Sequence, residues 1–68
     1  MEYQFIFLDT KGAARRLLAF KAPDDTTAIR YASRYCIEAD VPLEVRWCGA
    51  QIVLLTPMIA RLYLAVTN

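Results

Sequence analysis

The chain has 68 residues, enough for one domain, and 57% of them are hydrophobic against 22% that are charged. This composition excludes intrinsic disorder, which needs low hydrophobicity and high net charge. The formal net charge is only +1, whereas a domain that binds nucleic acid usually carries a clear basic excess that neutralises phosphates. Nucleic acid is therefore disfavoured as the main partner.

The two cysteines, Cys36 and Cys48, stand far apart and no histidine accompanies them. Zinc sites need close cysteine pairs and further Cys or His ligands, so we expect no metal and no other cofactor. Two reduced thiols in a cytoplasmic protein are the expectation, with a disulfide or a redox role as alternatives. The N-terminus lacks the features of a secretory signal. Residues 52–66 are apolar but too short to span a membrane, and Pro57 and Arg61 interrupt them.

The N-terminal third predicts a β-hairpin. Residues 2–8 alternate in hydrophobicity and favour a strand. Asp9-Thr10-Lys11-Gly12 is typical of a tight turn, in which Gly supplies a positive φ, and a second strand follows over 13–21. A three-residue loop would place Phe5 opposite Leu17, whereas a four-residue loop shifts each partner by one. We prefer the three-residue loop.

A single helix is predicted over 25–39. Pro23 ends the hairpin, and Asp24 or Asp25 can cap the first turn. The helical spacing of apolar residues defines an inward face, which consists of Ala28, Ile29, Ala32, Tyr35, Cys36 and Ala39.

A second hairpin follows the helix. Residues 43–48 and 51–56 favour strands joined by a Gly49-Ala50 turn, which sets Trp47 opposite Ile52 and predicts a buried indole. Residues 57–68 are ambiguous. Thr56 could cap a short helix with Pro57 in its first position, but the apolar residues also alternate as in an extended arm.

These elements predict an α+β fold of order ββαββ, an antiparallel sheet of two hairpins with one helix on a face. The expected organisation is a domain over 1–56 followed by an apolar C-terminal segment over 57–68. The fourth strand is apolar on both sides, and one helix can cover only one face of a sheet.

Uncovered apolar residues on a soluble protein usually mark an interface. We therefore expect an interaction module that self-associates, most simply as a homodimer, or that binds a partner protein. The expected interface consists of Ile6, Leu18, Phe20, Val53, Leu55, Met58 and Leu62.

The alternative is a nucleic-acid-binding or toxin-binding accessory protein, similar to an antitoxin. Its surface would be a basic patch of Lys11, Arg15, Arg16 and Lys21. Catalysis is not expected, because the only serine, Ser33, lies within the predicted helix with no histidine to activate it. No phosphate-binding loop or metalloprotease motif occurs.

Three segments, F-I-F-L-D-T-K-G over 5–12, A-P-D-D-T-T-A over 22–28 and L-E-V-R-W-C-G over 43–49, resemble a group of small uncharacterised proteins of alphaproteobacteria such as the rhizobia. That group combines a strand ending in F-x-L-D-x-x-G, a D-D-x-x-A helix start and a late strand ending in W-x-G. The resemblance covers roughly residues 3 to 56 and implies no known activity. A weaker similarity, to HicB-type antitoxins, rests on the helix start after a hairpin, without their Gly-rich strand motif.

Overall fold

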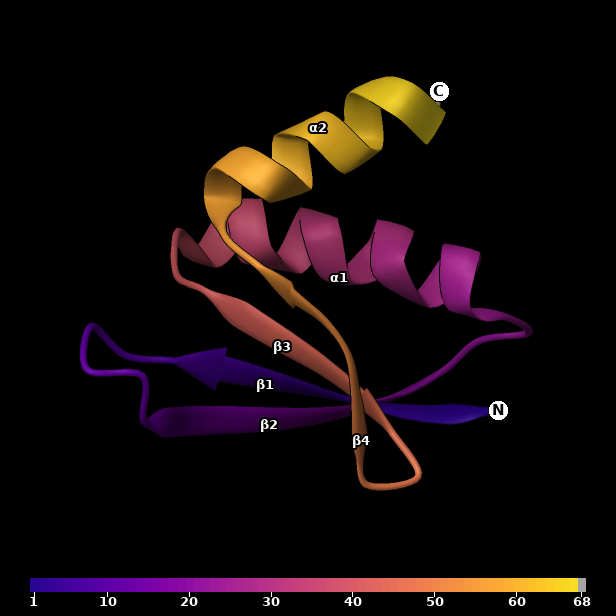
Figure 1. Cartoon of the computed structure of the whole chain (residues 1–68), viewed down its shortest axis with the longest axis horizontal. Helices are drawn as coiled ribbons and strands as arrows, with labels where there is room; N and C mark the ends of the chain where they lie inside the picture. Colours follow the sequence, from indigo (N-terminus) through magenta and orange to yellow (C-terminus); the bar gives the residue numbers. More distant parts are fainter. Residues whose placement is uncertain (68) are drawn as a thin grey trace.

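A computed structural model describes residues 1–67, and in it four antiparallel strands form one sheet in the order β2-β1-β3-β4 (Figure 1). The elements in chain order are β1 (Glu2–Leu8), β2 (Ala14–Lys21), α1 (Asp25–Ala39), β3 (Leu43–Trp47), β4 (Ala50–Leu55) and α2 (Pro57–Thr67). Helix α1 covers one face of the sheet, and α2 lies against α1 on the side away from the sheet. The fold is therefore α+β, as the sequence predicts.

The β1–β2 turn forms because Asp9 Oδ1 accepts hydrogen bonds from the backbone N–H groups of Lys11 (2.8 Å) and Ala13 (2.9 Å), and Gly12 has φ 81°. The register is the alternative one, with Phe5 opposite Leu18. Our preference for Leu17 opposite Phe5 was wrong. A slip of one residue exchanges the two faces of a strand, so the observed register turns alternate apolar residues of β2 toward α1.

Helix α1 has the predicted bounds. Asp24 caps its start, where Oδ1 accepts from the N–H of Thr27 (2.8 Å), and Asp40 closes its end in the left-handed conformation with φ 56°. Its fully buried residues are Ala28, Ala32, Ser33 and Cys36. The expected inward face holds for Tyr35, whose ring contacts that of Phe5 at 6.0 Å although the side chain is partly exposed, but it was wrong for Ala39, which is exposed.

The β3–β4 turn consists of Cys48 and Gly49, with φ 51° and 78°, the two positive values of a type I′ hairpin turn. Trp47 therefore lies opposite Ala50, and the expected Gly49-Ala50 turn with Trp47 opposite Ile52 was wrong. Trp47 lies at the end of the hairpin and is 38% exposed, so the expected burial of its indole was also wrong.

The main core lies between the sheet and α1. Phe5 stacks on Phe20 at 5.1 Å between ring centroids, and Phe20 contacts Tyr31 at 5.0 Å. The fully buried members from the strands are Tyr3, Phe5, Leu43, Val45 and Leu55. Leu18, Phe20 and Val53 pack against this core.

The opposite face of the sheet is mixed rather than apolar. One cross-strand row contains Leu17, Ile6, Glu44 and Leu54. Arg46 Nη1 donates to Glu44 Oε2 at 2.8 Å, and Nη2 donates to the carbonyl of Gly49. The expectation of two apolar faces was wrong, because β2 is shifted by one residue from the expected register and the irregularity between Val45 and Arg46 exchanges the faces of β4.

Candidate interaction surface

Helix α2 settles the ambiguity of residues 57–67 in favour of a helix. Thr56 caps it, since Thr56 Oγ1 accepts from the N–H of Ile59 (3.3 Å) and the Thr56 carbonyl accepts from Ala60 (2.8 Å). Pro57 occupies the first turn, where its missing N–H costs no hydrogen bond. Ala60 is fully buried and Tyr63 packs against the core, so this side of α2 is held on the body of the protein.

The outer face of α2 is apolar as well. Helical spacing places Met58, Ile59, Leu62 and Val66 on the side opposite Ala60. Met58 is 73% exposed, Leu62 61% and Val66 84%. The only charged residue of this helix is Arg61. A helix that is apolar all round is normally buried, and α2 is covered on one side only.

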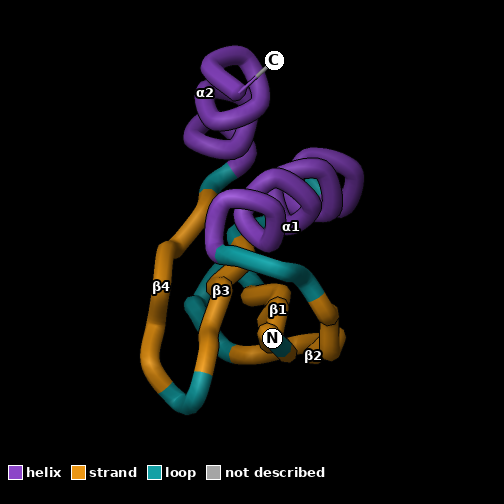
Figure 2. The backbone as a smooth tube through the Cα atoms, turned by 90° about the vertical axis from the view of Figure 1, so that its right-hand side faces the viewer, coloured by secondary structure: helices purple, strands orange, loops and turns teal. Residues whose placement is uncertain are grey.

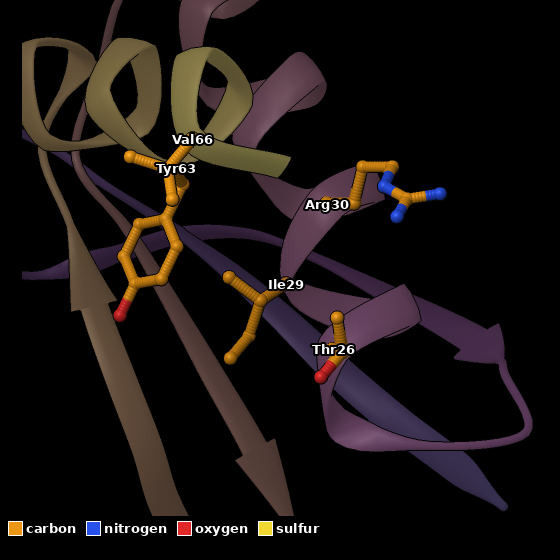
Figure 3. A pocket seen from close by; sticks show the side chains of 5 residues that line it. All are labelled: Thr26, Ile29, Arg30, Tyr63 and Val66. Atoms are coloured by element: carbon orange, nitrogen blue, oxygen red, sulfur yellow. The ribbon is translucent and has the colours of Figure 1, made fainter. Parts of the chain in front are cut away.

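A pocket of about 230 Å³ opens between α2 and the first half of α1, where the two helices diverge (Figure 3). Thr26, Ile29 and Arg30 line it from α1, and Tyr63 and Val66 from α2. A shallower hollow of about 280 Å³ adjoins it and shares Tyr63 and Val66. These lining residues suit the binding of apolar groups, with Arg30 as the only charged member.

The structure separates the expected interface residues. Met58 and Leu62 lie together on the outer face of α2, and Ile6 is half-buried on the open face of the sheet. Leu55 is fully buried and cannot form a surface in the folded chain. Leu18, Phe20 and Val53 pack against the core on the α1 side, so their expected position on an uncovered face was wrong.

The expected basic patch is only partly assembled. Arg15 and Arg16 line one hollow of about 300 Å³, where Arg16 lies over the Phe7 ring at 5.4 Å. Lys11 lies in the β1–β2 turn, and Lys21 ends β2 beside Glu2. Lys21 lies six positions after Arg15, about 20 Å along the strand. The four residues therefore do not form one compact patch. Nucleic-acid or toxin binding stays a prediction.

The two cysteines are free and differ in environment. Cys36 is buried and its Sγ donates to the carbonyl of Val41 at 3.1 Å, whereas Cys48 is exposed in the β3–β4 turn. Burial, and next the nearby Asp40, raise the pKa of the Cys36 thiol. No cluster of three potential metal ligands occurs among residues 1–67. Neither of the two described helices is long and apolar enough to cross a bilayer.

Comparison of the chain with protein-family models, with curated proteins and with solved structures gave no match. The resemblance to small rhizobial proteins therefore stays a prediction.

Proposed function

We propose that this chain is a self-associating protein-interaction module whose binding surface is the outer face of α2. The observation that carries the proposal is the continuous exposure of Met58, Leu62 and Val66 on a helix whose other side is already packed. Large exposed apolar patches on small soluble domains usually mark interfaces.

A second copy of the chain suits this surface because the surface is uncharged along its centre. A two-fold axis brings each patch against its own copy, so a charged patch would meet like charge. The outer face of α2 has no such conflict, since Arg61 lies at its flank. Full burial of a Leu, Met or Val side chain stabilises by about 1.5–3 kcal/mol, and several such side chains are available on each copy.

Leu62→Glu tests the proposal, with Leu17→Glu as the matched control. The two leucines are similarly exposed, at 61% and 58%, but Leu17 lies on β2, far from α2. Glutamate is a good helix former, so α2 should remain folded. We expect L62E to raise the dissociation constant of the dimer at least about tenfold in sedimentation velocity, and L17E to leave it unchanged.

Point substitution is a sharper test than removal of α2. Cutting the chain after Pro57 would uncover residues of α1 that α2 now packs against, and a misfolded product would not report on the interface. Equal effects of L62E and L17E would contradict an interface on α2. A wild-type chain that stays monomeric, but whose outer face binds an apolar peptide helix, would replace self-association by partner binding.

A further inference from the structure

The two edges of the sheet differ in charge. β2 forms one edge and carries Arg15, Arg16 and Lys21, whereas β4 forms the other edge and has no charged residue. Charged side chains on an edge strand discourage pairing with another chain. Charged side chains therefore protect β2 from pairing with another chain, whereas β4 has no such protection. An irregularity in the β3–β4 pairing precedes Val53, so the regular part of the open edge is Val53–Leu55.

Along this part of β4, one peptide group faces outward. Hydrogen bonds alternate along antiparallel strands, and the N–H of Leu8 on β1 donates to the carbonyl of Pro42 just before β3 (2.9 Å). In the observed registers, the same alternation directs the backbone N–H and C=O groups of Val53 and Leu55 toward β3. The N–H and C=O of Leu54 then point away from the sheet, and no described element lies beyond β4 (Figure 2).

The open edge adjoins α2 along the chain. Only Thr56 separates β4 from α2, and no described element covers the unpaired side of β4. An eleven-residue helix is about 16 Å long, so its outer face alone offers a few hundred Å². A standard interface buries roughly 800 Å² on each partner, so a stable dimer needs surface beyond α2.

We infer that β4 pairs antiparallel with β4 of a second copy, so that two four-stranded sheets join into one and the two α2 helices meet above the seam. This inference rests on the proposed self-association and names its geometry. A two-fold axis perpendicular to the sheet places both α2 helices on the same side of the joined sheet. Pairing of β4 with itself brings no charged side chains together, whereas pairing of β2 with itself would bring the arginines of two copies to one seam.

Hydrogen exchange of individual amides, measured by NMR on the full wild-type chain, tests this geometry. Leu54 is the probe and Leu17 the control, because both are exposed leucines on edge strands and the alternation turns both N–H groups outward. At a total concentration a hundred times the dissociation constant, we expect Leu54 to exchange about tenfold more slowly than in the monomer. Leu17 should exchange equally fast at both concentrations.

A mixed sample with one labelled and one unlabelled copy adds a second readout, since joined β4 strands give intermolecular contacts between their backbone protons. A dimer in which Leu54 stays unprotected would overturn the joined sheet while leaving self-association through α2 intact. Slow amide exchange at Leu17 instead of Leu54 would overturn pairing through β4 and would favour pairing through β2. Absence of any dimer would overturn both proposals.

Discussion

The hydroxyl of Tyr3 donates a hydrogen bond of 2.6 Å to Oδ1 of Asp25, which joins the central strand β1 to the first turn of α1. Tyr3 is fully buried. Burial, and next the hydrogen bond to the Asp25 carboxylate, raise the pKa of the Tyr3 phenol to about 12. The phenol must therefore stay protonated for the strand and the helix to remain joined.

Alkaline pH should weaken the fold through this residue. Because the pKa of Tyr3 is higher in the folded than in the unfolded chain, its contribution is complete below about pH 10 and is lost as pH rises through about 12. We expect the urea midpoint to fall across this range, and the fall to be smaller in Tyr3→Phe. Ultraviolet titration of the folded chain should show one of its four tyrosines ionising last. Ionisation of all four near pH 10 would contradict this.

Truncation of Leu55 and truncation of Leu54 should have very different effects on the free energy of unfolding, although the two residues are neighbours. Leu55 is fully buried beneath α1, whereas Leu54 is 44% exposed at the open edge. We expect Leu55→Ala to lower the free energy of unfolding by about 2–5 kcal/mol and Leu54→Ala by less than about 1 kcal/mol. Urea denaturation at a concentration where the chain is monomeric measures both. Similar losses of unfolding free energy in the two variants would contradict the burial of Leu55 and the exposure of Leu54.

Trp47→Ala should lower the free energy of unfolding by less than the truncation of a buried tryptophan would. Full burial would imply a loss of about 3–5 kcal/mol, but the indole is 38% exposed at the end of a hairpin, so we expect about 1–2 kcal/mol. Tryptophan fluorescence, which reports only Trp47 in this chain, should show a partly solvated indole in the native state. Unfolding of the variant at room temperature would place Trp47 in the core after all.

The two thiols should react at very different rates. Cys48 is exposed, whereas Cys36 is buried and its pKa is raised, so less of it is present as the reactive thiolate. With a disulfide reagent, we expect one fast thiol in the native chain and two after denaturation. Cys48→Ser should remove the fast phase. A fast phase that persists in this variant would mean that Cys36 is accessible.

Much of the fold could be predicted from local signals. The bounds of α1 followed from Asp24 at its start and the break after Ala39, whereas Thr56-Pro57 indicated α2 only as one of two alternatives. The faces of the strands could not be predicted in the same way. The first hairpin depended on a turn whose length was uncertain by one residue, and the second on an irregularity between Val45 and Arg46 that no local signal predicted. Either one exchanges the two faces of a strand.

The candidate surface was predictable only in part for the same reason. Met58 and Leu62 were expected there on their apolar character alone, whereas Leu55 and Phe20 were expected on a face that β2 and β4 turn toward α1. The choice between helix and arm for residues 57–67 depends on packing against α1, a long-range contact that periodicity in a short segment does not reveal.

Sedimentation equilibrium of the wild-type chain at micromolar concentration tests self-association most directly. We expect a reversible monomer–dimer equilibrium in which the mean mass approaches twice the chain mass of 7.8 kDa as concentration rises. The dimer should persist at high salt, because the contacts are apolar rather than ionic. A single species at 7.8 kDa across the whole concentration range would contradict it.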